Sequence, residues 1–209
     1  MKAAIKVGLF SRKGTNRVLV EALDHDYRPD AVIVPVGILL PKSGRVWIYM
    51  VRSPATADAI VDALEAFWRD NRASFPNVKR LVIDQDNGPE NNSHRTQFMG
   101  RVVTFADEAA IDVRLAYYPP YHSKYNPIER YWGALERNWN GSLLDTVEAV
   151  VGYASKMVWK GMLPVVELVE KVYEKGVSLA KAAMKAVEAR LTREETLGRW
   201  FLDIVHRVA

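Results

Sequence analysis

The first fifty residues have the apolar spacing of β-strands. Apolar side chains alternate with others over 5–9 and 18–20, and denser apolar runs follow over 32–40 and 46–51. A period of two puts every second side chain on one face of a strand, so each of these segments is predicted to be a strand. The Pro41–Gly44 segment between the last two runs has the composition of a turn, which predicts an antiparallel hairpin.

Beyond residue 53, helical and extended patterns alternate. Apolar residues at helical spacing predict helices over about 53–71, 93–109 and 126–139, and short apolar runs predict strands over 81–83 and 113–117. Helices between consecutive strands imply parallel crossover connections. The chain is therefore predicted to have an α/β fold, a mixed β-sheet flanked by helices, in the element order of a ribonuclease H-like fold.

The last third of the chain has helical spacing almost throughout. Helices are predicted over roughly 143–159, 164–174 and 178–208, with breaks at Gly161 and Gly176. The predicted organisation is a core over residues 1–142 and a C-terminal helical extension over 143–209 that packs on this core.

Composition narrows the classes of protein that remain. The 209 residues, 49% apolar and 26% charged, are typical of a globular domain. Cysteine is absent, which excludes disulfides, a thiolate nucleophile and cysteine-ligated metals. Apolar runs stay well below the ~18–20 residues of a membrane span, and the first ten residues are too short and lysine-interrupted for a signal peptide. The net charge of +4 permits a polyanionic partner without requiring one.

The first candidate site is the acidic stretch around Asp84 and Asp86. Two carboxylates two positions apart point to the same side of a strand, and Asp86 lies where the predicted strand gives way to a loop. Such strand ends are where α/β sheets build their sites, and a carboxylate there can hold a hard divalent cation. The following Asn87-Gly88 is also ordinary turn chemistry, so the pattern by itself leaves both readings open.

The second candidate is Glu129, three residues after Asn126. Asn126 as N-cap, Pro127 in the first turn and Glu129 at the third position form a capping box, which is a structural role. The functional interpretation is that Glu129 projects beside Asp86 and shares a metal ion with it. Both interpretations fit the residues equally well.

Two further groups of residues are candidates for binding a metal ion or nucleic acid. The acids around His25, namely Asp24 and Asp26, can bind metal, although a surface role is favoured. Basic residues near aromatic ones are suited to phosphate neutralisation and base stacking. These basic residues are Arg12, Lys13, Arg17 and Lys124, with His122 beside them. Signature motifs of metalloproteases, nucleotide hydrolases, dinucleotide-binding enzymes and serine hydrolases are absent.

Two segments in order resemble a known family. LVIDQDNGPENNS, starting at Leu81, and YPPYHSKYNPIERYW, starting at Tyr118, resemble the DDE transposases of bacterial insertion sequences, in the branch related to mariner elements. The resemblance covers nearly the whole chain, including FSRKGTNR and DHDYRPDA. It implies a ribonuclease H-like, integrase-type core that cuts and joins DNA strands with Mg²⁺ or Mn²⁺. By motif position, Asp86 matches the second acid and Glu129 the third.

The resemblance carries several further implications. Asp86 and Glu129 would be both catalytic residues and metal ligands. Arg12, Lys13, Arg17, His122 and Lys124 would contact nucleic acid. The partners would be DNA, both the element's ends and its target, together with a second copy in a homodimer. The location would be the bacterial cytoplasm, at the nucleoid when DNA is bound.

The chain departs from the family pattern at its start. The family's first acid precedes the stretch matched here by 4–8, so it is expected upstream of Met1, with the first strand truncated and the DNA-recognition part also upstream. Asp84 and Asp26 are the alternatives for this carboxylate. The expected function is a transposase catalytic domain that is impaired as the chain stands. The alternatives are a non-catalytic DNA-binding or assembly module and an unrelated metal-dependent phosphodiesterase.

Overall fold

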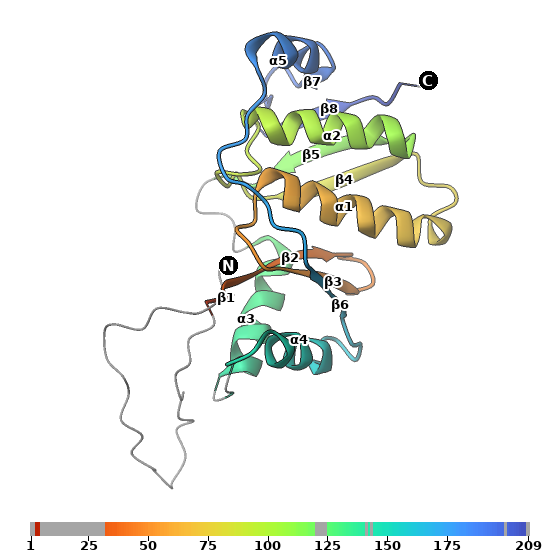
Figure 1. The fold of residues 1–209 in the computed structure, drawn as a ribbon. Coiled ribbons are helices and arrows are strands. Elements are labelled where there is room, and N and C mark those ends of the chain that lie inside the picture. The colour runs from red at the N-terminus through yellow and green to blue at the C-terminus, as the bar shows by residue number, and fades with distance from the viewer. Residues whose placement is uncertain are drawn as a thin grey trace, which may run out of the picture. The chain divides into compact units, whose positions relative to one another are not determined.

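The computed structural model forms two compact units, each made of two separate stretches of chain (Figure 1). Unit 1 comprises Met1–Pro54 and Pro127–Val172, and unit 2 comprises Ala55–Asn126 and Tyr173–Ala209. The residues that the structure describes are 3–4, 32–119, 125–140, 142, 144–198 and 200–207. Within these ranges, the helices are too short or too polar to cross a membrane.

Unit 1 contains a mixed sheet in the strand order β1-β2-β3-β6 and two helices. Its strands are β1 (Ala3–Ala4), β2 (Val32–Leu39), β3 (Val46–Val51) and β6 (Val165–Val169), and its helices are α3 (Pro127–Trp139) and α4 (Val147–Lys156). Neighbouring strands are antiparallel except β3 and β6, which are parallel. The predicted hairpin is confirmed, with Gly44 at φ 77° in its turn.

The core of unit 1 forms between the sheet and the two helices. Ile48 and Met50 of β3 are buried in one cluster with Tyr131 and Leu135 of α3, which lie on the apolar stripe of that helix. Gly37 of β2 allows a close approach, because a Cβ atom there would lie 2.5 Å from the ring of Trp132.

Unit 2 contains a second mixed sheet in the order β4-β5-β8-β7. Its strands are β4 (Arg80–Gln85), β5 (Asp112–Tyr117), β7 (Leu191–Arg193) and β8 (Phe201–Ile204). Strands β4 and β5 are parallel, and the other pairs are antiparallel. Its helices are α1 (Ala57–Asn71), a 3-10 turn (Arg72–Ser74), α2 (Thr96–Ala109) and α5 (Lys181–Glu188).

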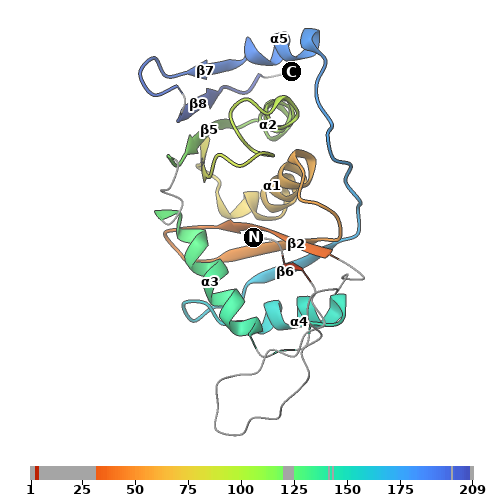
Figure 2. The same ribbon diagram turned by 90° about the vertical axis from the view of Figure 1, so that its left-hand side faces the viewer.

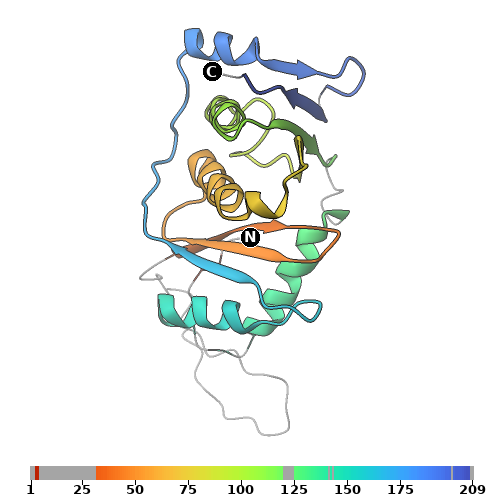
Figure 3. The same ribbon diagram turned by 90° about the vertical axis from the view of Figure 1, so that its right-hand side faces the viewer.

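Helices α1 and α2 run side by side along one face of this second sheet, as the two side views show (Figures 2 and 3). Phe98 and Phe105 of α2 are buried against Leu115 of β5 and Leu202 of β8, so the C-terminal strand completes the core of unit 2. Burying such side chains contributes about 1.5–3 kcal/mol each. Because β4 and β5 are parallel, their carboxyl ends lie at the same edge of the sheet.

The structure confirms the predicted α/β class, although the strands form two mixed sheets where one was predicted, and it corrects part of the C-terminal prediction. Residues 164–174, predicted as a helix, contain β6, because the β-branched run over 165–169 pairs with β3. The segment 178–208, also predicted as one helix, contains the short α5 and then strands β7 and β8. The proposed core-and-extension boundary at residue 142 stays a prediction.

Two helices also begin a few residues later than the predicted ranges 53–71 and 93–109. Thr56 caps α1, with its hydroxyl accepting from the Ala59 N–H at 3.4 Å. Arg95 occupies the cap position of α2 and makes no side-chain capping bond. The predicted strands over 5–9 and 18–20 lie outside the described residues.

Candidate functional site

The end of β4 presents two carboxylates on one side of the strand. Asp84 and Asp86 are exposed, whereas Gln85 between them is buried, as the period of two predicts. Partial burial desolvates the Asp84 carboxyl and raises its pKa above the usual value. Asp86 is the first residue beyond the strand, so its carboxylate stands at the carboxyl end of the parallel β4–β5 pair.

Asn91 holds the Asp86 side chain and backbone together. Its Nδ2 lies 3.1 Å from Asp86 Oδ1, 3.0 Å from the Asp86 carbonyl oxygen and 3.2 Å from Gln85 Oε1. Gly88 makes room for this amide, because a Cβ atom there would lie 2.8 Å from Asn91 Oδ1. The loop after β4 thus folds back onto its own strand end.

Two residues from outside the loop hold it in place. The hydroxyl of Tyr117, at the end of β5, donates to the Asn91 carbonyl at 3.0 Å. Burial raises the pKa of Tyr117, which keeps this donor protonated. Arg193, from β7, donates to the Ser93 carbonyl at 3.0 Å. The C-terminal hairpin therefore helps to support the loop that carries Asp86.

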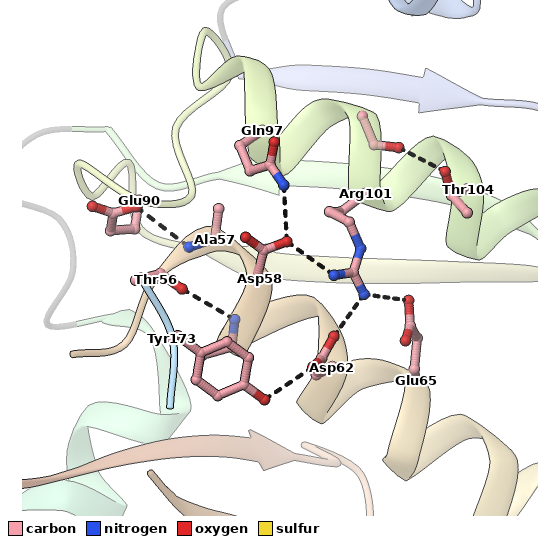
Figure 4. Close-up of polar contacts among 12 residues, drawn as sticks. Thr56, Ala57, Asp58, Asp62, Glu65, Glu90, Gln97, Arg101, Thr104 and Tyr173 are labelled. Carbon is pink, nitrogen blue, oxygen red and sulfur yellow. Dashed lines mark hydrogen bonds and ion pairs between the residues drawn. The ribbon is translucent and has the colours of Figure 1, made fainter. Parts of the chain in front are cut away.

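The same loop is joined to the start of α1. Glu90 accepts from the backbone N–H of Ala57, the first residue of α1, at 3.3 Å (Figure 4). A carboxylate is favourable there because the first N–H groups of a helix lack partners and carry partial positive charge. Arg95 pairs with the same carboxylate at 3.2 Å. Glu90 is thereby a structural carboxylate.

A second acidic group in unit 2 surrounds a single cation. Asp58, Asp62 and Glu65 lie on α1, and their carboxylates are 2.9, 2.6 and 2.9 Å from the Arg101 guanidinium of α2 (Figure 4). Tyr173 donates a further hydrogen bond to Asp62 at 2.9 Å. This arrangement joins α1 to α2 through ion pairs.

Glu129 belongs to unit 1. It lies in the first turn of α3, where the helix dipole favours an acid, and it is exposed. Asp86 belongs to unit 2, so the predicted sharing of a metal ion by the two carboxylates stays a prediction. Among the described residues, no group of three or more histidine, aspartate or glutamate side chains is placed to hold a metal ion.

The remaining candidates lie outside the described residues, and their roles stay predictions. These are Arg12, Lys13, Arg17, Asp24, His25, Asp26, His122 and Lys124.

Sequence reasoning missed three residues that support Asp86. Asn91 stands inside the quoted motif, so its position offered a signal. Tyr117 was recognised only as a strand residue. Arg193 was placed in a predicted helix, and no local pattern could connect it to Ser93.

The comparison with protein families identifies the family of this chain. The model of the Rhodopirellula transposase DDE domain matches residues 1–206. The chain is thus a transposase domain, and it belongs to this DDE family, whose fold class agrees with the ribonuclease H-like α/β prediction. Searches of curated proteins and of solved structures found no match.

The family assignment settles part of the functional prediction. Transposition, a form of DNA recombination, is the function of the family. The family match is inconsistent with the alternative of an unrelated phosphodiesterase. The relation to mariner elements, the homodimer and the cellular location stay predictions.

Proposed function

We propose that this chain takes part in metal-dependent cleavage and joining of DNA, with Asp86 and Glu129 as the metal ligands. The observation that carries the proposal is the exposed Asp86 carboxylate at the end of β4, held in one orientation by Asn91. The proposed ions are Mg²⁺ or Mn²⁺. Both are hard cations, which prefer oxygen ligands such as carboxylates.

The donor set fits such an ion at Asp86. Its Oδ1 accepts from Asn91, and no other described residue donates to Oδ2, which is thereby available to a cation. A cation held by Asp86 and Glu129 would supply a Lewis acid for breaking and forming phosphodiester bonds. Asp86 contributes an oriented negative charge, and Glu129 contributes a second carboxylate at a helix start.

Metal binding tests the two ligands. Calorimetry with Mn²⁺ measures the affinity of the unchanged chain and of its variants. Asp86→Ala and Glu129→Gln are each expected to weaken binding at least tenfold, a typical scale for disrupted metal sites. Glu136→Gln, two turns further along α3, is the matched control and should bind like the unchanged chain. Equal binding in all four proteins would show that neither acid is a ligand.

DNA binding is proposed to be electrostatic, through Arg12, Lys13, Arg17, His122 and Lys124. The chain should bind duplex DNA with little sequence preference, with a Kd on the order of 10⁻⁴–10⁻⁶ M that weakens steeply with salt. Lys124→Ala should lower the salt slope by about one, whereas Lys124→Arg should retain it. Tight, salt-insensitive binding to one sequence would contradict this proposal.

The second candidate function is a non-catalytic DNA-binding or assembly module. Its support is the net charge of +4, which permits binding to a polyanion without any catalytic step. A plasmid-nicking assay with Mn²⁺ separates the two. Slow nicking that disappears in Asp86→Ala supports impaired catalysis, and the absence of nicking alongside DNA binding supports the module.

A further inference from the structure

We propose that Asn91 is a positioning residue that orients Asp86 so that a cation binds chiefly through one oxygen, Oδ2. This inference rests on the proposed function, because it assumes that Asp86 holds a metal ion. It adds a residue and a binding mode that the family match does not assign.

The first step is the way Asn91 grips Asp86. One amide nitrogen lies within hydrogen-bonding distance of both the side-chain Oδ1, at 3.1 Å, and the backbone carbonyl, at 3.0 Å. Linking the carboxylate to its own backbone through one amide restricts the rotation that an exposed aspartate otherwise keeps. A hydrogen bond to a carboxylate is also stronger than one between neutral groups.

The second step is that Asn91 is itself fixed. The Tyr117 hydroxyl holds its carbonyl at 3.0 Å, and Tyr117 is only 4% exposed. On the other side, Gly88 packs so closely that a Cβ atom would lie 2.8 Å from Asn91 Oδ1. Metal ligands must be held to within about 0.5 Å, and a fixed partner provides that precision.

The third step concerns the choice of cation. The hydrogen bond from Asn91 draws electron density from Oδ1, so Oδ2 is the stronger donor to a cation. Mg²⁺ demands near-octahedral geometry and keeps several waters, which suits a single carboxylate oxygen. Ca²⁺ also accepts both oxygens of one carboxylate. Asn91 therefore favours the smaller ion by making two-oxygen binding at Asp86 less favourable.

The experiment compares two neighbouring asparagines. Asn91→Ala removes the contact with the Asp86 carboxylate. Asn92→Ala removes hydrogen bonds to the Gly88 and Pro89 carbonyls, at 3.1 and 3.2 Å, in the same loop. Asn91→Asp keeps the shape of the side chain but replaces the amide donor with a second carboxylate.

Calorimetry with Mn²⁺, Mg²⁺ and Ca²⁺, alongside thermal unfolding, provides the measurement. Asn91→Ala is expected to weaken Mg²⁺ and Mn²⁺ binding about tenfold or more and to weaken Ca²⁺ binding less, so that the Mg²⁺/Ca²⁺ preference falls. Asn91→Asp is expected to strengthen binding of all three ions, because it adds an oxygen ligand. Asn92→Ala should leave the affinities and their ratio unchanged.

The outcomes separate this inference from the proposed function. If Asp86→Ala abolishes metal binding while Asn91→Ala binds with unchanged affinity and ion preference, the positioning role is overturned and the proposed function stands. If Asn91→Ala and Asn92→Ala weaken all ions equally, Asn91 acts only on loop stability, and the inference is again overturned. If Asp86→Ala binds like the unchanged chain, both fall.

Discussion

Arg101 is the residue whose replacement should most clearly separate partly buried from exposed ion pairs in this protein. It meets three carboxylates of α1, and only a quarter of its side chain is exposed (Figure 4). Burial lowers the pKa of Arg101, but hydrogen bonds to Glu65 and Asp62 outweigh it and raise that pKa above its usual value. Arg101→Met removes the charge, retains most of the apolar stem, and leaves three acids without their cation.

The expected loss of stability is about 2–4 kcal/mol. Removing one partner of a buried pair costs roughly 3–5 kcal/mol, because a charge is left desolvated. Partial exposure of the acids, 19–33% of each side chain, allows water to screen them and reduces that figure. At roughly 2–4 °C per kcal/mol for a chain of this size, Tm should fall by about 5–15 °C.

Urea unfolding and thermal unfolding measure the loss, and hydrogen exchange at the amides of α1 and α2 locates it in unit 2. Arg69→Met is the matched control. Arg69 pairs with its neighbour Asp70 at 2.7 Å, but its side chain is 72% exposed, so the expected loss is below about 0.5 kcal/mol. Adding Asp62→Asn to Arg101→Met should recover about 1 kcal/mol, because it removes one uncompensated carboxylate.

Two results would refute this reasoning. A loss for Arg101→Met no larger than that for Arg69→Met would show that the cluster is effectively solvated. A double variant less stable than Arg101→Met would show that Asp62 stabilises the fold independently of Arg101, through its hydrogen bond from Tyr173.

Two further predictions concern acid stability and glycine packing. Arg114 holds the pKa of Asp203 below its usual value, so this pair stabilises the fold above about pH 4 and loses that effect as pH falls through the lowered pKa. In urea titrations, Asp203→Asn should therefore reduce the decline below pH 4. Gly37→Ala should cost about 1–3 kcal/mol, because the added Cβ clashes with Trp132. At Gly152 an added Cβ meets nothing within 4 Å beyond its own stretch of helix, so Gly152→Ala should be neutral or stabilising by up to ~1 kcal/mol. Equal effects of the two alanines in urea unfolding would contradict the packing argument.

Local patterns were sufficient for much of the fold and for placing two carboxylates at the end of one strand. Periodicity and turn residues act over a few positions, and they were enough to predict most elements before residue 140. These elements are the hairpin of β2 and β3, the helices α1, α2 and α3, and the strands β4 and β5. The shared side of Asp84 and Asp86 follows from the same period of two. Residue types at the end of a strand also indicated a carboxylate site for a hard cation.

The tertiary structure alone decided what lies far apart along the chain. The 165–169 run has both helical and alternating apolar positions, and only its pairing with β3 makes it a strand. Strand β8 likewise depends on its pairing with β5, where Asp203 of β8 meets Arg114 of β5, and β7 depends in turn on β8. The loop that carries Asp86 is likewise held by residues far away in the sequence. It is held by Tyr117 from β5 and Arg193 from β7, because hydrogen bonds and strand ladders depend on distance in space, which local sequence spacing does not encode.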